Sequence, residues 1–158
     1  MMQTLKPFLW FNDNAEEAVE FYLSVFPNAK RGAVLRAPEG SPNPPGSVLT
    51  ATFTIGGIEF VALNGGPRYP FTPAISFVVP CETQAEIDAM WGKLSAGGKE
   101  VQCGWVTDKF GLSWQVVPVN IEGLLRGKDA EGGKRAMAAM LQMVKLDIDA
   151  LKRAGGLA

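Results

Sequence analysis

Apolar and polar residues alternate most clearly in the segment 49–55. Leu49, Ala51, Phe53 and Ile55 are separated by threonines, a period of two that predicts a β-strand with one buried face. Gly56-Gly57 follows, and a second apolar run occupies 58–64. Two glycines between two strand patterns are typical of a tight hairpin, so we expect these runs to pair in antiparallel fashion.

A helical period precedes this hairpin. Its apolar positions are spaced three and four residues apart, at Ala18, Phe21, Tyr22 and Val25. The residues Asn12-Asp13-Asn14 offer N-caps, and Phe26-Pro27 predicts the end of the helix because the residue before proline avoids helical geometry. Short strands are expected on either side, at 5–11 and 31–37.

The same order recurs in the second half of the chain. A strand is predicted at 74–79, and Thr83-Gln84-Ala85-Glu86 is a capping box that begins a helix ending at Gly97-Gly98. Strand patterns follow at 100–106 and 112–119. A shift of 69 residues superposes the two helical stripes and places Phe8 on Phe77. The chain therefore has the pattern of an internal repeat.

We interpret 1–158 as a single α+β domain of two βαβββ modules. Module one spans about 1–66 and module two about 74–120, joined by the segment NGGPRYPFTP. A C-terminal helix is expected at about 129–154. Its apolar stripe consists of Met137, Met140, Leu141, Val144, Ile148 and Leu151. The stripe suits either a helix docked on its own sheet or a contact between two copies of the chain.

Charge and composition narrow the function. The formal net charge is −1, which gives no electrostatic basis for binding nucleic acid or an anionic membrane. No apolar run is long enough to span a bilayer, and the N-terminus lacks a signal-peptide pattern. Cys81 and Cys103 are too few for a disulfide framework. We therefore expect a cytoplasmic protein.

The chain has no histidine. Catalysis by Ser-His-Asp or Cys-His groups within one chain is thereby excluded. The usual zinc sites and the two-histidine, one-carboxylate iron site are excluded as well.

Several stretches together resemble one family. They are PFLWFNDNAEEAVEFYLSVFPNAK, ALNGGP, AISFVV, CGWVTDKFGLSWQVVP and AMAAMLQMVKLDIDAL. They are similar to the PhnB-like "3-demethylubiquinone-9 3-methyltransferase domain" branch of the glyoxalase/bleomycin-resistance/dioxygenase superfamily, also called vicinal oxygen chelate. The resemblance implies paired βαβββ modules that curl into a half-barrel, commonly completed in a homodimer. Catalytic members hold a divalent metal there as a Lewis acid.

The resemblance also implies where metal ligands would lie. The stretch 108–115 matches the family frame Asp-x-x-Gly-x-x-x-Glu and places Gln115 where the metal-binding glutamate stands. The other ligand positions fall near Lys6 or Phe8, and at Ala74 or Ser76. A neutral amide cannot hold a divalent ion alone, so we expect no metal and no other cofactor.

The candidate ligand-binding residues are one amide, its polar companions and two indole rings: Gln115, Ser76, Asn64, Trp10 and Trp105. Each has a structural alternative, namely an exposed strand position for Gln115, a turn for Asn64 and core packing for the tryptophans. Asp108 is either an acid or base or, as we favour, the cap of its turn. Both cysteines are interpreted as inert buried thiols.

These residues favour a small-molecule-binding protein of unknown substrate, with or without metal-free catalysis, that forms a homodimer. One alternative is a metal-dependent lyase, isomerase or dioxygenase of the same superfamily. Another is a methyltransferase, as the branch name suggests. That activity usually requires a glycine-rich turn between a strand and a helix, and no glycine pair here stands in such a place. A last alternative is a dimeric structural module without a ligand.

Overall fold

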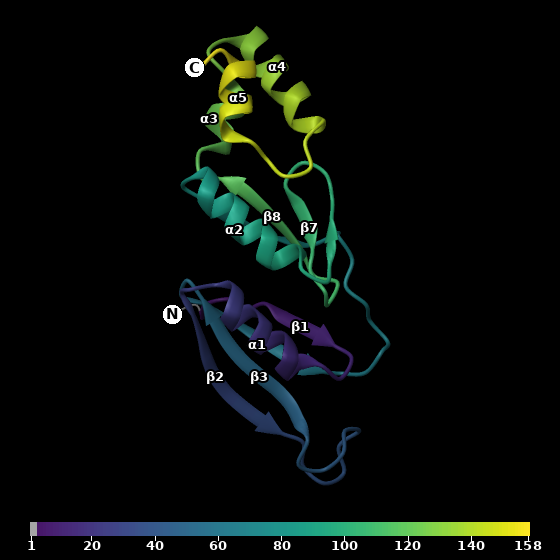
Figure 1. The fold of residues 1–158 in the computed structure, drawn as a ribbon. Coiled ribbons are helices and arrows are strands. Elements are labelled where there is room, and N and C mark those ends of the chain that lie inside the picture. The colour runs from purple at the N-terminus through teal and green to yellow at the C-terminus, as the bar shows by residue number, and fades with distance from the viewer. Residues whose placement is uncertain (1–2) are drawn as a thin grey trace. The chain divides into compact units, whose positions relative to one another are not determined.

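The computed structural model describes residues 3–158 and divides the chain into two compact units, Met1–Phe71 and Thr72–Ala158 (Figure 1). Each unit contains a strand, a helix and then three more strands. The predicted α+β class and the repeated βαβββ order are therefore confirmed. The two units are described separately below.

Unit 1 is a four-stranded mixed sheet with one helix. Its elements are β1 (Phe8–Phe11), α1 (Ala15–Val25), β2 (Ala29–Arg36), β3 (Val48–Ile55) and β4 (Ile58–Asn64). The strand order is β1-β4-β3-β2, with β1 parallel to β4 and the other pairs antiparallel. The predicted hairpin is confirmed. Gly56 and Gly57 adopt φ values of 56° and 86°, which glycine tolerates best.

One face of this sheet packs against α1. Tyr22 of α1 stacks on Phe53 of β3 with ring centroids 5.6 Å apart, and Phe53 stacks on Phe60 of β4 at 5.1 Å. These three aromatic side chains are buried. The other face carries Trp10, which is half-buried, and Phe8, which is 59% exposed. The alternation along β1 thus separates a core face from a face available to other contacts.

Unit 2 has the same strand order. Its repeat consists of β5 (Ser76–Cys81), α2 (Gln84–Ser95), β6 (Lys99–Glu100), β7 (Trp105–Thr107) and β8 (Ser113–Pro118), with the sheet order β5-β8-β7-β6. The threonine half of the predicted capping box is confirmed by the 3.2 Å bond from the Glu86 backbone N–H to Thr83 Oγ1. The Glu86 side chain accepts the N–H of Glu82, one residue before the cap, at 2.6 Å. The single strand predicted at 100–106 is wrong, because Cys103 and Gly104 turn the chain with φ values of 60° and 81°.

The core of this sheet lies between α2 and the α2-facing residues of β7 and β8. Ile87 and Leu94 of α2 and Val116 of β8 have no exposed surface. Trp91 is also buried, and its Nε1 donates to Glu100 Oε1 at 2.7 Å. Trp91 and Trp114 are therefore core residues, as the sequence indicated.

The two modules are not related by one uniform shift. Phe8 lies on the face of its sheet opposite α1, whereas Phe77 lies beside buried Trp114, with ring centroids 5.6 Å apart. Because neighbouring residues of a strand lie on opposite faces, the shift that superposes β1 on β5 with matching faces differs from 69 by an odd number. A shift of 69 does superpose the first residues of the helices, Ala15 and Gln84. The strand-to-helix turns therefore differ in length by an odd number of residues.

The C-terminal region differs from the expectation of one helix at about 129–154. Three helices stand there: α3 (Ile121–Arg126), α4 (Ala130–Leu141) and α5 (Ile148–Gly155). Between α4 and α5 the backbone carbonyls of Met143 and Val144 accept the N–H groups of Cys103 and Gly104, both at 2.8 Å. Asp147 then caps α5 by accepting from the Ala150 N–H at 2.8 Å. The apolar stripe therefore does not belong to one continuous helix.

Only part of that stripe is buried. Leu151 has no exposed surface, and neither does Leu146, which was not assigned to the stripe. Met137, Leu141 and Val144 are 41%, 52% and 43% exposed. The segment thus docks on its own unit through Leu146 and Leu151, while α4 keeps exposed apolar side chains.

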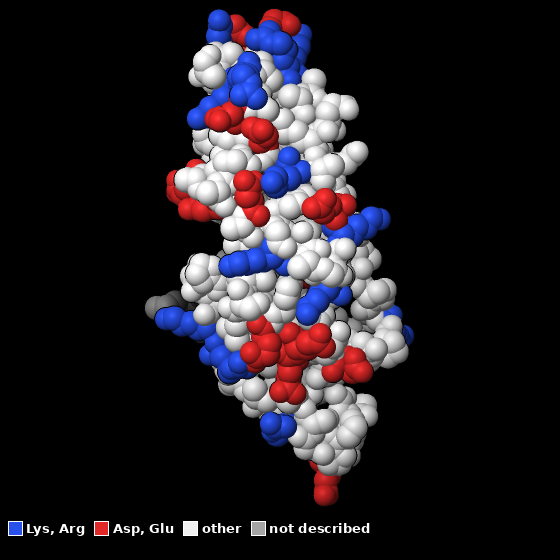
Figure 2. Space-filling view, viewed as in Figure 1, with Lys and Arg blue, Asp and Glu red and all other residues white. Residues whose placement is uncertain are grey.

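Charges of both signs are interspersed over the face shown in Figure 2. Acidic side chains gather over α1, where Glu16, Glu17 and Glu20 are exposed. Arg31 of β2 forms an ion pair with Glu20. Within the part of the chain that the structure describes, no helix has both the length and the apolar character needed to cross a membrane.

Candidate functional site

Three of the predicted site residues lie together in unit 2. Gln115 of β8 stands between Val78 of β5 and Trp105 of β7 in the strand register. Its Nε2 donates to Ser76 Oγ at 2.9 Å. Gln115, Ser76 and Trp105 are half-buried, and Val78 is 56% exposed. We call Ser76, Val78, Trp105 and Gln115 the amide cluster; it lies on the face of the sheet opposite Trp114 and Val116.

The turn before β8 sets the register of this cluster. Asp108 Oδ1 accepts the backbone N–H groups of Phe110 at 2.8 Å and Leu112 at 3.1 Å, and Oδ2 accepts Trp114 Nε1 at 2.9 Å. Asp108 is only 2% exposed. The prediction that it caps the turn is confirmed, and it adds a bond to the core tryptophan that the sequence did not indicate.

Asn64 has a structural task in unit 1. Its Oδ1 accepts the backbone N–H of Ala15 at 2.8 Å, and its Nδ2 donates to the Val48 carbonyl at 3.0 Å. It therefore caps the start of α1 from a neighbouring strand, since the side chain of the N-cap residue Asn14 makes no capping bond. Asn64 is the last residue of β4. The long-range cap was not visible in the sequence, because it requires β1 and β4 to be adjacent.

Trp10 lies against the loop that follows β4. Its Nε1 donates to the Gly66 carbonyl at 2.8 Å, and its ring meets Tyr69 edge-on with centroids 4.9 Å apart. A Cβ on Gly65 would lie 2.4 Å from Trp10 Cε2, so this position requires glycine. The sequence predicted only a connection between the modules here and gave no signal for Tyr69 or the neighbouring Arg68.

The five predicted residues thus form two sets. Trp10 and Asn64 belong to unit 1, and Ser76, Trp105 and Gln115 belong to unit 2. Each set is organised by contacts within its own unit. A shared pocket formed by all five residues stays a prediction.

The positions at which the superfamily places a metal do not fit a divalent cation. Lys6 is paired with Glu59, with 2.5 Å between Nζ and Oε1, and a lysine ammonium group has no acceptor atom for a cation. Phe8 and Ala74 offer no donor atoms, and Ser76 is a neutral hydroxyl. Gln115 is a neutral amide that already donates to Ser76. Among residues 3–158, no three His, Cys, Asp or Glu side chains are grouped so that they could hold a metal ion. Divalent ions favour several anionic or imidazole donors.

The cysteines differ from each other. Burial, with a smaller contribution from the negative charge of Glu86, raises the pKa of the Cys81 thiol to about 11. Cys81 is therefore protonated and unreactive at neutral pH, as expected. Cys103 is half-buried rather than buried, and both cysteines are free thiols.

The comparisons with known proteins agree with this architecture. Residues 3–117 match the family model described as 3-demethylubiquinone-9 3-methyltransferase. The structure of a PhnB protein from Bacillus cereus, described as a candidate 3-demethylubiquinone-9 3-methyltransferase, is 37% identical with a TM-score of 0.66. The match covers 73% of this chain and 99% of that one. No curated protein was found to match the sequence.

Two more distant structures share the fold. Protein PA1353 from Pseudomonas aeruginosa is 24% identical with a TM-score of 0.60, over 74% of this chain and 98% of that one. The fosfomycin resistance protein FosX from Listeria monocytogenes is 17% identical with a TM-score of 0.55, over 79% and 98%. At these identities the likeness shows the fold alone.

The family match ends at residue 117, before α3. The C-terminal stretch AMAAMLQMVKLDIDAL therefore lies outside the matched residues, although the sequence suggested that it belonged to the same resemblance. The match to the two modules covers most of the chain. The chain therefore belongs to the PhnB-like 3-demethylubiquinone-9 3-methyltransferase family.

Proposed function

We propose that this protein binds a small molecule through the amide cluster and does so without a resident divalent metal. The observation that carries the proposal is the 2.9 Å bond from Gln115 Nε2 to Ser76 Oγ, at the position where the family frame places a metal-binding carboxylate. An amide fixed in this way keeps its carbonyl oxygen Oε1 for a ligand N–H or O–H group.

The neighbours of Gln115 suggest the chemistry of the ligand. Trp105 lies directly across the strand pair from Gln115, and Val78 lies on its other side. An indole ring and an exposed valine favour a flat or apolar molecule. We therefore propose a ligand with one hydrogen-bond donor on an otherwise apolar, planar body.

A metal analysis tests the first half of the proposal. Protein purified without a histidine tag and analysed for its elements should contain far less than one divalent ion per chain. Gln115→Glu should not change this result, because Lys6 and the neutral Ser76 still offer no suitable donors. Stoichiometric metal in the unmodified protein would overturn the proposal and favour the metal-dependent alternative.

A ligand screen tests the second half. Compounds that bind only the folded protein raise its melting temperature. Compounds from a library of planar molecules with an N–H or O–H donor should raise the melting temperature of the wild type but not of Gln115→Leu. Gln142→Leu is the matched control, because Gln142 is an exposed amide between α4 and α5. Compounds that stabilise both variants equally would argue against the amide cluster.

The family description favours a second candidate, a methyltransferase. The glycine pairs do not support it. Gly56-Gly57 joins β3 to β4, Gly65-Gly66 follows β4 in a loop, and Gly97-Gly98 follows α2. None begins a helix, as a cradle for S-adenosylmethionine would require. We expect S-adenosylmethionine to leave the melting temperature unchanged, and a saturable rise would revive this candidate.

The free thiols of Cys81 and Cys103 suit a reducing compartment. We therefore keep the cytoplasm as the proposed location.

A further inference from the structure

The loop 65–71 of unit 1 is held firmly at its start. The backbone N–H groups of Gly65 and Gly66 donate to the carbonyls of Phe11 and Asn12, both at 2.9 Å. Asn43 Nδ2 donates to the Asn64 carbonyl at 2.8 Å, immediately before the loop. Pro67 follows, and proline restricts the backbone at the turn. The loop therefore leaves β4 in a defined direction.

An aromatic surface is built on this loop. Trp10 is fixed by its bond to Gly66 and by its close approach to Gly65. Tyr69 meets the Trp10 ring edge-on, at an angle of 81° between the ring planes, and remains 52% exposed. At the end of the loop, Phe71 makes a similar edge-on contact with buried Phe11, with centroids 5.2 Å apart. The exposed Tyr69 is thus positioned by its own contact with Trp10 and by the contact of Phe71, two residues later, with Phe11.

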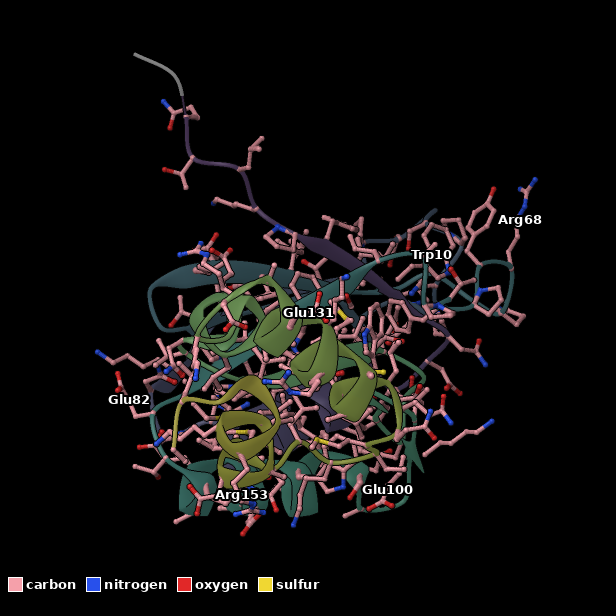
Figure 3. The ribbon with its side chains drawn as sticks, turned by 90° about the horizontal axis from the view of Figure 1, so that it is seen from above. Trp10, Arg68, Glu82, Glu100, Glu131 and Arg153 are labelled. Carbon is pink, nitrogen blue, oxygen red and sulfur yellow. The ribbon has the colours of Figure 1, made fainter. Side chains whose placement is uncertain are left out.

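Arg68 adds a positive charge to this surface. Its Cζ lies 5.2 Å from the Tyr69 ring centroid, within the range of a cation–π contact. Figure 3 shows the Arg68 side chain extending outward from the loop that also borders Trp10. Within residues 3–158, no carboxylate forms an ion pair with Arg68. The contact with the ring leaves the N–H edges of the guanidinium available, and their fork geometry matches a carboxylate.

We propose that Arg68, Tyr69 and Trp10 form a binding site for an aromatic carboxylate. The guanidinium would bind the carboxylate in bidentate fashion, and the exposed ring surfaces of Tyr69 and Trp10 would contact the aromatic ring. The site shares no residue with the amide cluster and lies wholly in unit 1. The test of this site is therefore independent of the test of the proposed function.

Benzoate is the probe that tests this site. Trp10 supplies a local signal, because its indole N–H resonance can be assigned by its loss in Trp10→Phe. Benzoate should shift this resonance saturably, with a dissociation constant on the order of 1 mM for so small a ligand. The indole signals of Trp91, Trp105 and Trp114 should not move. Benzamide, which has the same ring without the charge, should bind about tenfold more weakly.

Variants identify the residues. Arg68→Gln should weaken benzoate binding about tenfold, and Tyr69→Leu should weaken it too, because each removes one half of the site. Lys109→Gln is the matched control, since Lys109 Nζ lies 5.3 Å from the Phe110 ring in unit 2. It should bind benzoate as the wild type does, and so should Gln115→Leu. Melting temperatures verify that each variant is folded.

Several results would overturn the proposal. These results are the absence of a saturable shift of the Trp10 resonance with benzoate, equal binding of benzamide, and unchanged benzoate binding in Arg68→Gln. Loss of benzoate binding in Gln115→Leu would place the ligand at the amide cluster instead. The proposal requires the opposite outcome in each of these four measurements.

Discussion

At the scale of single residues, polar side chains with several hydrogen bonds organise both units: Asn64 is half-buried in unit 1, and Asp108 is buried in unit 2. Asp108 accepts three hydrogen bonds and Asn64 bonds to two backbone groups from different elements. Within residues 3–158 no buried side-chain nitrogen or oxygen lacks a partner. Such groups are costly to disturb, because removing one partner strands the other away from water.

Asp108 should therefore be important for stability. We expect Asp108→Asn to lower the free energy of unfolding by about 1–3 kcal/mol, because its amide nitrogen would face the buried Trp114 N–H. Asp108→Ala should cost more, since it also removes the acceptor of two backbone N–H groups. Urea denaturation followed by tryptophan fluorescence measures both effects.

Asp129 provides the comparison. It caps α4 with one bond, to the Gly132 N–H at 2.8 Å, so Asp129→Ala should cost only about 1 kcal/mol. If the Asp108 variants were no less stable than Asp129→Ala, the three hydrogen bonds of Asp108 would not contribute substantially to the free energy of unfolding.

At the scale of elements, the segment between α4 and α5 is fixed by contacts with α2 and with the turn at Cys103. Gln84 of α2 donates from Nε2 to the Leu146 carbonyl at 3.0 Å, and its Oε1 accepts the Ile148 N–H at 2.9 Å. Lys145 pairs with Asp88 at 2.7 Å. The bonds from Lys145 and Gln84 lower the pKa of Asp88. One face of α2 therefore holds the C-terminal region in place.

Gln84→Ala should release this segment more than it affects the rest of the protein. We expect faster proteolysis and faster hydrogen exchange at 142–148, because two bonds to the segment are lost. The free energy of unfolding should fall by about 1–2 kcal/mol. Gln142→Ala, which removes an exposed amide from the segment itself, should leave both rates unchanged. Equal rates in the two variants would show that Gln84 does not hold the segment.

At the scale of the whole molecule, each unit buries its own core and still exposes apolar side chains. Phe8 on β1, Leu35 on β2 and Leu141 on α4 are 59%, 57% and 52% exposed. Single exposed apolar side chains are common on monomers, and only a contiguous patch marks a site of association. The homodimer stays a proposal, which rests on the resemblance to the family.

Light scattering coupled to gel filtration tests the dimer. The mass should be about twice the 17.0 kDa of one chain. Leu35→Lys is expected to shift the mass toward one chain if β2 contributes to the contact, and Ile58→Lys at the exposed hairpin serves as a second site. A mass of one chain for the wild type at all concentrations would refute the proposal.

The sequence alone determined the repeated strand–helix–strand order, the glycine hairpin and the cap at Asp108. Periods of two and 3.6 residues and the geometry of turns are local properties, and they are visible in short windows. The same local patterns predicted one helix at 129–154, because the apolar stripe continues on both sides of Asp147, from Val144 to Ile148. They also predicted one continuous strand at 100–106, which the turn at Cys103 divides.

Only the tertiary structure decided the rest. The break between α4 and α5 depends on bonds to Gln84 and Cys103, which are distant in sequence. The cap from Asn64, the bond from Gln115 to Ser76 and the edge-on contact of Trp10 with Tyr69 all need segments that become neighbours on folding. Long-range contacts of this kind leave no periodic signal in the chain, because the pairing of strands is settled by the whole sheet.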